Sequence, residues 1–157
     1  MVVSTARALY ADTDQMGIVN HAVALRWFEQ ARAEWLRRLG YSYHEMEAEG
    51  MLLPVYELQV RYHKSARYDQ VVLLDAMLRQ PGPVRVIFDY KILDSDSREL
   101  LIAGTTHHAV VGRNGRPRRL SESMQTLLSR GKLADSEQPS RIEPVGVLAP
   151  YSRQGER

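Results

Sequence analysis

The residues with the clearest potential for chemistry are two aspartates in the segment ADTDQMGIVNH, residues 11–21. Asp12 and Asp14 lie two residues apart, and the apolar periodicity of a helix begins soon after them. A carboxylate can act as a nucleophile or activate water as a general base. Free N–H groups at a helix N-terminus bind anionic or polarised oxygen. The segment therefore has the parts that acyl transfer needs, although either aspartate could instead cap the loop or the helix.

Histidine adds a second functional group at this point. His21 could orient a substrate or move a proton, or it could simply fill a partly exposed position at the start of the helix. His107 and His108 are adjacent in a predicted strand, so their side chains point to opposite faces and do not suggest a shared metal site. The chain has no cysteine, which excludes a cysteine nucleophile and thiolate metal sites. The sequence predicts no metal and no cofactor.

A helix over residues 22–39 must position these groups. Apolar side chains recur at helical spacing in it, namely Leu25, Phe28, Trp35, Leu36 and Leu39. Gly40 is a plausible C-cap, and a second, short helix is expected over 42–49. Three charged residues of the long helix, Glu29, Arg32 and Glu34, are expected to be solvated; burial with a functional role is the alternative.

Five strands are predicted around this helix. One of them, over residues 55–63, has an alternating pattern that predicts one buried face, made by Tyr56, Leu58, Val60 and Tyr62. The other four are expected over residues 3–10, 70–80, 84–93 and 100–111. Short, turn-like connections favour antiparallel pairing, and one helix against such a sheet gives a two-layer α+β domain.

The outer face of this predicted sheet mixes charged and apolar residues. Ile87 and Leu93 alternate there with Arg85, Asp89 and Lys91. Such a mixture indicates partial burial, and hence an oligomer.

The C-terminal part predicts a short helix followed by a tail. The helix is expected from Glu122 to Ser129, with Ser121 as its N-cap and Gly131 behind it. Residues 132–157 contain three prolines and few large apolar groups, which predicts an extended or disordered tail after a domain of residues 1–131. Truncation after Gly131 is then expected to leave folding intact, unless the tail docks on a neighbouring subunit.

Charge and hydropathy limit the partners. The net charge is only +2, but the stretch GRNGRPRR, residues 112–119, is strongly basic. It is either a solvated hairpin loop or a contact for a phosphate-bearing partner, and no nucleic-acid-binding motif accompanies it. We see no signal pattern and no membrane span, so a cytoplasmic location is expected.

Two longer segments, YADTDQMGIVNH (10–21) and LRWFEQARAEWLRRLG (25–40), resemble the YbgC-like and 4-hydroxybenzoyl-CoA thioesterase family of hotdog proteins. The segments LLPVYELQVRYHKSARYDQ (52–70) and HHAVVGRNGRPRRL (107–120) resemble it too, and the likeness extends over about residues 3–130. The resemblance implies a hotdog fold, in which a curved antiparallel sheet wraps one long helix. It also implies a homodimer or homotetramer that hydrolyses coenzyme A thioesters in a channel at the dimer interface.

The same resemblance assigns roles to residues. Asp14 matches the family's catalytic carboxylate, and His21 would offer its backbone N–H to the thioester oxygen. The chain departs from the family at Asn20, where an aromatic residue is common, and at Val23 and Ala24, where Asn and Tyr are frequent; these changes leave the acyl group open. Our candidate substrate-binding residues are Gly17, Asn20, Ala24, Arg61, Lys64 and Arg67. The three cations among them would serve the coenzyme A phosphates or would be ordinary surface charges.

Three other functions are compatible with the same residues. The acyl group could arrive on an acyl carrier protein, which is acidic and would use the basic patch at 113–119. The chain could be a non-catalytic acyl-CoA binding module, although mere binding does not require the Asp14 carboxylate. A hotdog dehydratase is disfavoured because no matching Asp/His hydratase motif is present.

Overall fold

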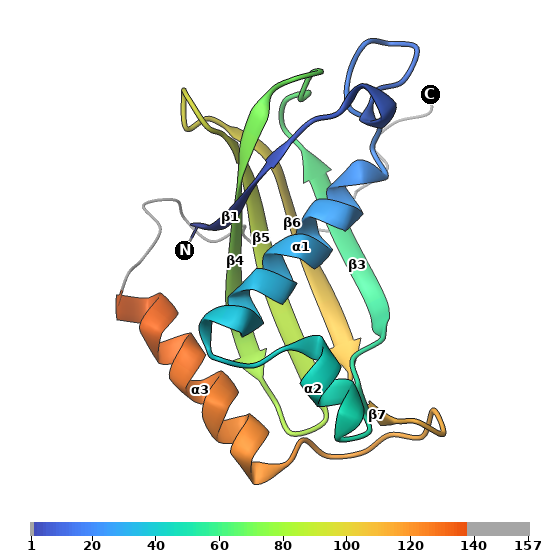
Figure 1. Cartoon of the computed structure of the whole chain (residues 1–157), viewed down its shortest axis with the longest axis vertical. Coiled ribbons are helices and arrows are strands. Elements are labelled where there is room, and N and C mark those ends of the chain that lie inside the picture. Colours follow the sequence, from blue (N-terminus) through green and yellow to red (C-terminus); the bar gives the residue numbers. More distant parts are fainter. Residues whose placement is uncertain (1, 138–157) are drawn as a thin grey trace, which may run out of the picture.

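A curved five-stranded antiparallel sheet wraps around one long helix, α1 (Figure 1). The computed structural model describes residues 2–137, apart from the side chain of Gln80. The strand order is β1-β4-β5-β6-β3, and β2 pairs with β7 in a separate two-stranded ribbon. The strands are β1 (Val2–Arg7), β2 (Met51–Leu52), β3 (Val55–Tyr62), β4 (Val71–Pro81), β5 (Arg85–Asp94), β6 (Leu100–Ala109) and β7 (Val111–Gly112), and the helices are α1 (Val23–Arg38), α2 (Tyr43–Ala48) and α3 (Glu122–Glu137). This arrangement confirms the predicted α+β hotdog fold.

Helix α1 ends where its sequence predicts. Gly40 has a φ of 77°, a conformation that glycine adopts without steric cost. Its N–H donates to Arg37 O at 2.9 Å, and the N–H of Tyr41 donates to Leu36 O at 3.2 Å. These two bonds make a Schellman motif, which satisfies the last carbonyls of the helix and turns the chain toward α2.

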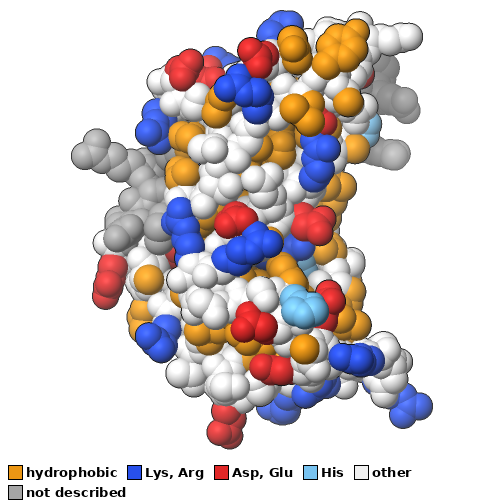
Figure 2. Space-filling view, viewed as in Figure 1, with side chains coloured by type: hydrophobic (Ala, Val, Ile, Leu, Met, Phe, Trp, Pro, Cys, Tyr) orange, Lys and Arg blue, Asp and Glu red, His pale blue; other side chains and the backbone are white. Residues whose placement is uncertain are grey.

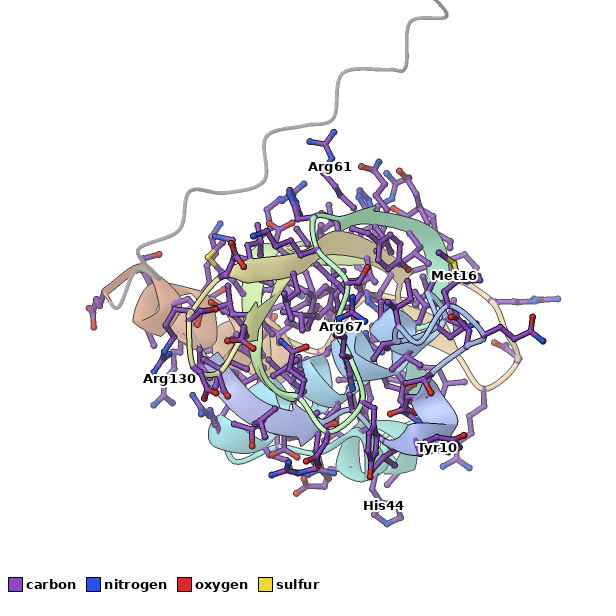
Figure 3. All side chains as sticks on the ribbon, turned by 90° about the horizontal axis from the view of Figure 1, so that it is seen from above. Tyr10, Met16, His44, Arg61, Arg67 and Arg130 are labelled. Atoms are coloured by element: carbon purple, nitrogen blue, oxygen red, sulfur yellow. The ribbon has the colours of Figure 1, made fainter. Side chains whose placement is uncertain are left out.

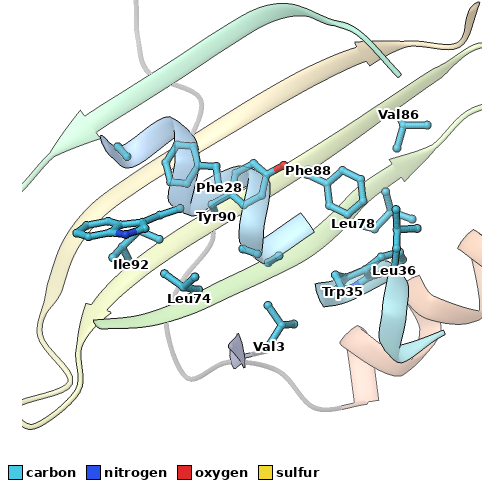
Figure 4. Close-up of a cluster of buried hydrophobic side chains, with 14 of the residues drawn as sticks. Val3, Phe28, Trp35, Leu36, Leu74, Leu78, Val86, Phe88, Tyr90 and Ile92 are labelled. Atoms are coloured by element: carbon cyan, nitrogen blue, oxygen red, sulfur yellow. The ribbon is translucent and has the colours of Figure 1, made fainter. Parts of the chain in front are cut away.

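The core lies between α1 and the concave face of the sheet (Figure 4). Phe28 stacks on Tyr90 with ring centroids 4.5 Å apart, and Trp35 meets Phe88 edge-on at 5.2 Å. A Cβ at Gly104 would lie 2.4 Å from the Phe28 ring, so only glycine lets α1 approach β6 this closely. Stacked and edge-on aromatic pairs add stability beyond the area they bury, and they fix the helix at one height on the sheet.

Strand β3 lies at the edge of the sheet and not in its covered centre. Tyr56, Leu58 and Tyr62 are 50%, 40% and 48% exposed, so the prediction of a buried face on this strand is wrong for the single chain. The alternation is real, but α1 does not reach far enough to cover it. Figure 2 shows hydrophobic side chains along the edge where β3 lies.

The outer face of the sheet satisfies its charges within the chain. Asp89 and Lys91 are buried together with Leu93. Arg79 donates to both carboxylate oxygens of Asp89, and the Thr105 hydroxyl donates to the same carboxylate at 2.7 Å. The predicted burial of this mixed face is therefore present in one chain, and it gives no separate argument for an oligomer.

Helix α3 is twice as long as the sequence suggested. Ser121 caps it as predicted, accepting a hydrogen bond from Met124 N at 3.3 Å. The helix does not stop before Gly131 but continues to Glu137, because Gly131 serves for close packing: a Cβ there would lie 2.5 Å from Trp35 Cη2. The buried Asp135 then accepts from Trp35 Nε1 at 2.9 Å and from Leu78 N at 3.2 Å. Residues 132–137 are thus helical, and the rest of the predicted tail lies outside the described residues.

Between Val2 and Glu137, none of the helices combines the length and the apolar character that a membrane crossing requires.

Candidate active site

A tight loop before α1 holds Asp14. Thr13 and Val19 form an antiparallel bridge, and the N–H of Asp14 donates to Ile18 O at 3.0 Å. Gly17 closes the turn with a φ of 71°. The carboxylate oxygen Oδ1 of Asp14 accepts the N–H of Met16 at 2.8 Å, and the side chain remains half-buried. The loop therefore fixes the direction of this carboxylate and leaves its other oxygen toward the cavity described below.

Asp12 has the structural role that the sequence left open. It is buried, and its Oδ2 accepts the N–H of Leu9 at 2.9 Å. Its Oδ1 pairs with the guanidinium of Arg26 on α1, and its carbonyl accepts the N–H of Asn20 at 2.7 Å. Asp12 therefore joins the loop to the helix, and only Asp14 is available for chemistry.

The N-terminus of α1 presents a backbone donor beside this loop. Asn20 Oδ1 accepts the N–H of Ala22 at 2.9 Å, so the asparagine side chain closes a turn just before the helix. The carbonyl of His21 accepts the hydroxyl of Tyr62 at 2.6 Å, which ties the helix start to the end of β3. Within residues 2–137 the N–H of His21 has no hydrogen-bond acceptor. It is therefore free to bind an oxygen that carries developing negative charge.

Asp14 and His21 line one cavity of about 240 Å³. Three further polar residues line it, namely Tyr62, Lys64 and Ser65. Its apolar wall is made by Met16, Ile18, Val19, Ala66 and Ile102. We call this the Asp14 cavity. A carboxylate, a helix N-terminus and an apolar wall together suit a carbonyl attached to an apolar group.

The predicted cations are spread over different surfaces. Lys64 lines the Asp14 cavity and forms an ion pair with Glu99 at its surface. Arg61 projects from the side of the sheet opposite α1, as Figure 3 shows from above. Arg67 lies in the exposed loop after β3, outside the lining of the cavity. Lys64 is thus the cation that the fold places beside Asp14.

The other predicted substrate residues act mainly through the backbone or the core. Gly17 shapes the loop, and the Asn20 side chain closes the turn before α1. Ala24 is fully buried in the hydrophobic core and does not line the Asp14 cavity. A tyrosine at Ala24 would have to displace core side chains, so the prediction that this alanine binds substrate has no support in its position.

The sequence did not predict two residues that line the Asp14 cavity, and it wrongly placed one buried residue of α1 in solvent. Tyr62 and Ser65 were not nominated, and a single chain gives no signal for Ser65. Arg32, expected to be a solvated helix charge, is only 9% exposed, so that expectation is wrong. Its spacing from Phe28 and Leu36, four residues each way, places it on the apolar face and could have revealed it.

A chain of buried hydrogen bonds runs from Arg32 into the sheet. Arg32 Nη1 donates to Tyr90 Oη at 3.1 Å, and Tyr90 Oη meets Thr106 Oγ1 at 2.8 Å. Thr106 in turn meets His108 Nε2 at 2.8 Å, while His108 Nδ1 lies 2.9 Å from the carbonyl oxygen of Leu53. Burial, helped by the Arg32 charge, lowers the pKa of His108 to about 4. This histidine is therefore neutral at physiological pH and belongs to the scaffold.

The basic stretch forms a hairpin at the opposite end of the molecule from the Asp14 loop (Figure 1). Arg113 donates to Glu47 O at 2.9 Å, and Arg118 donates to Glu49 O at 3.1 Å and to Gly50 O at 3.0 Å. These bonds satisfy carbonyls at the end of α2. The same arginines and Arg116 line an open hollow of about 600 Å³. The hairpin is thus structural at its base and cationic at its surface.

The fold and the site together define a hotdog-fold protein with a carboxylate beside the N-terminus of its long helix. The family description "Thioesterase-like superfamily" matches residues 9–144, and the chain belongs to this family. It is similar to the putative acyl-CoA thioesterase YneP of Bacillus subtilis, with 34% identity over 65% of this chain and 73% of that protein. It is 28% identical to the acyl-CoA thioester hydrolase YbgC of Escherichia coli over 75% of this chain and 88% of YbgC.

Solved structures show the same relationship. The DHNA-CoA thioesterase of Staphylococcus aureus has a TM-score of 0.78 at 29% identity, and the match covers 89% of this chain and 95% of that one. The hypothetical protein TT1821 of Thermus thermophilus has a TM-score of 0.74 at 34% identity, covering 81% of this chain and 98% of the other. The comparisons confirm the YbgC-like resemblance and establish the chain as a thioesterase.

Proposed function

We propose that this chain hydrolyses acyl-CoA thioesters and that Asp14 supplies the reacting carboxylate. The observation that carries the proposal is the Asp14 cavity, in which a half-buried carboxylate and the uncommitted N–H at the start of α1 face one apolar space. The names of the YneP and YbgC relatives support coenzyme A as the carrier of the acyl group.

Two mechanisms of thioester hydrolysis are compatible with this site, one with Asp14 as a general base and one with Asp14 as a nucleophile. As a general base, Asp14 takes a proton from water while the water oxygen bonds to the carbonyl carbon. The C–S bond then breaks, and the departing thiolate takes that proton. As a nucleophile, a carboxylate oxygen of Asp14 bonds to the carbonyl carbon, the thiolate leaves, and water cleaves the resulting anhydride. Both forms place negative charge on the carbonyl oxygen, where the N–H of His21 would stabilise it.

We further infer that two copies pair through β3. Within residues 2–137 no strand pairs with its outer backbone edge, and its apolar side chains Val55, Leu58 and Tyr62 are exposed. Antiparallel pairing of two β3 strands about a twofold axis would join the sheets and cover these residues. The Asp14 cavity, which reaches β3 at Tyr62, would then lie beside the interface.

The proposal is tested by thiol release from a panel of acyl-CoA esters. Asp14→Asn keeps the size of the side chain and its bond to Met16 but removes the charge. We expect kcat on the best ester to fall by about 10²–10⁴-fold with little change in KM. Retention of full activity by the variant would contradict the assignment. In a single turnover in ¹⁸O-water, label on Asp14 would indicate the nucleophilic form, because only hydrolysis of an anhydride brings a water oxygen to this carboxylate; label on the released acid alone is compatible with both forms.

Two matched variants separate the roles at this site. His21→Ala retains the backbone N–H, so we expect a smaller loss of kcat than for Asp14→Asn. Asp12→Asn should act mainly on stability, because it weakens the bonds to Leu9 and Arg26. If His21→Ala abolishes turnover while Asp14→Asn is mild, the histidine is the base.

The basic hollow favours a second candidate, an acyl carrier protein as the carrier. Arg113, Arg116 and Arg118 face this hollow and would attract an acidic partner. The same acyl group should be offered on coenzyme A and on a carrier protein. If Arg116→Glu slows only the carrier-bound substrate, the carrier is a substrate; if neither ester is cleaved but both bind, the chain is a binding module.

A further inference from the structure

A second cavity of about 290 Å³ lies between α1 and β3, farther along β3 from the Asp14 cavity. Its apolar wall is made by Leu25, Phe28, Val55 and Leu58, and its polar lining includes Arg32 and Thr106. We call this the Arg32 cavity. From Tyr62 in the Asp14 cavity to Leu58 here is four residues of β3, or about 13 Å. An acyl group with its thioester at Asp14 and its far end at Arg32 would have to span a comparable distance.

The guanidinium at the inner end of this cavity has only neutral partners. Arg32 donates to the hydroxyls of Tyr43 and Tyr90, and its Cζ lies 5.6 Å from the centroid of the Tyr43 ring. Burial raises the pKa of Tyr43 to about 12 and also raises the pKa of Tyr90. Both phenols therefore keep their protons at neutral pH and do not balance the positive charge.

No carboxylate compensates this charge in the part of the chain that the structure describes. No acidic oxygen of residues 2–137 lies within 4.0 Å of the Arg32 guanidinium. A guanidinium has five N–H donors, and the two phenols use two of them. A buried charge that is not paired is costly, so proteins that retain one generally supply an anion or an acceptor to it.

We propose that Arg32 binds an oxygen at the far end of the acyl group, so that the substrates are thioesters whose acyl part carries a distal carboxylate or hydroxyl. This inference rests on the acyl-CoA hydrolysis proposed above. The apolar wall at Leu25 and Phe28 takes the chain or ring of the acyl group, and the guanidinium takes its polar end. Glu29, which is exposed and lines the same cavity, opposes a negatively charged end and sets the selectivity between charged and neutral oxygen.

Matched pairs of esters test this directly. Decanoyl-CoA is compared with the mono-CoA ester of decanedioic acid, and biphenyl-4-carbonyl-CoA with its 4′-hydroxy derivative and the mono-CoA ester of biphenyl-4,4′-dicarboxylic acid, because these frameworks are long enough to reach from one cavity to the other. We expect kcat/KM to be about 10- to 100-fold higher for the oxygenated member of at least one pair, the range for a charge-assisted hydrogen bond. The aliphatic and aromatic pairs tell which framework carries the oxygen.

Variants separate recognition from a structural role. Arg32→Gln should bring the preference within a pair close to one, whereas a purely structural change would slow both members equally. Glu29→Gln is at an exposed position and should raise the preference for the carboxylate esters several-fold, which keeps the test informative if Arg32→Gln does not fold. Arg130→Gln, on the exposed side of α3, removes one cation elsewhere and should leave the ratios unchanged.

Three outcomes would overturn the inference. Equal kcat/KM within every pair would refute it while leaving acyl-CoA hydrolysis intact. A preference that persists in folded Arg32→Gln would assign the recognition to another residue. Release of thiol from no ester would overturn the proposed function and this inference with it.

Discussion

At the scale of single residues, two carboxylates of the same type have opposite roles because their surroundings differ. Asp12 is buried; one carboxylate oxygen accepts the N–H of Leu9, and the other pairs with Arg26. One carboxylate oxygen of Asp14 accepts the N–H of Met16, and the side chain lines a cavity. The spacing left open which aspartate, if either, could serve chemistry, because the difference depends on contacts with α1 that spacing does not reveal.

The buried His108 predicts an acid-dependent loss of stability. Its pKa is about 4 in the folded chain, against 6.5 when unfolded, so between these values the unfolded chain binds the extra proton. Its contribution is complete above pH 6.5 and declines as the pH falls, by ~3 kcal/mol in the unfolding free energy by pH 4. Urea unfolding of the wild type and of His108→Gln at pH 7 and pH 4.5 measures this. An identical pH dependence in both proteins would contradict it.

At the scale of elements, the long helix and the central strands were predictable, whereas the limits of α3 and the burial of β3 were not. Periodicity identified residues 22–39, and α1 spans Val23–Arg38. Gly131 was taken as a stop signal because glycine usually follows helices. The structure shows instead that a glycine is needed at this position because Trp35 packs against it. Trp35 is 96 positions away in the chain, so this contact leaves no local pattern in the sequence.

Packing at Gly131 should outweigh helix propensity. Alanine is favoured over glycine in a helix by about 1 kcal/mol, but here its Cβ would overlap Trp35 and Leu39. Overpacking of this kind costs about 1–3 kcal/mol, so we expect Gly131→Ala to lower the unfolding free energy. Ser129→Ala, exposed on the same helix, is the control and should be neutral or slightly stabilising. Urea denaturation compares the two, and a stabilised Gly131→Ala would show that the helices separate easily.

The end of α3 should be needed for stability, contrary to the expectation from sequence. Truncation after Gly131 removes Asp135, and with it the acceptor for Trp35 Nε1 and Leu78 N. Hydrogen bonds to a charged group contribute about 1.5–3 kcal/mol each, so a loss of at least ~2 kcal/mol is expected. Truncation after Glu137 keeps the whole of α3 and is the matched control. Thermal unfolding of the two truncated forms tests this prediction. Equal melting temperatures would contradict it and would support the expectation from sequence that truncation after Gly131 leaves folding intact.

At the scale of the whole molecule, both cavities have β3 as one wall. The Arg32 cavity lies between α1 and β3, and the Asp14 cavity lies between the loop before α1 and the end of β3. Within residues 2–137, β3 has exposed apolar residues and no neighbour on its outer edge. The resemblance to hotdog proteins predicted an interface site, and the exposed edge explains physically why a second copy would complete it. Residues of a partner that would face these cavities have no signal in the sequence of one chain.

Charge on β3 should disrupt both assembly and activity. Leu58→Lys places a cation on the proposed interface, where burial without a partner is unfavourable. Light scattering at micromolar concentration should report a dimer or tetramer for the wild type and a smaller species for the variant, with a parallel loss of turnover. Leu133→Lys, at an exposed position on α3, should change neither. A monomeric and active wild type would exclude an interface-built site.

The bond between Trp35 and Asp135 also bears on how the protein is made. The two residues are 100 positions apart in the chain, so Trp35 leaves the ribosome long before its acceptor has been synthesised. At about 5–20 residues per second, the interval is roughly 5–20 s. Throughout that time the face of α1 that carries this indole lacks its final cover. The nascent chain therefore needs protection from aggregation until α3 emerges, and a ribosome stalled before codon 135 would release a product unable to seal its core.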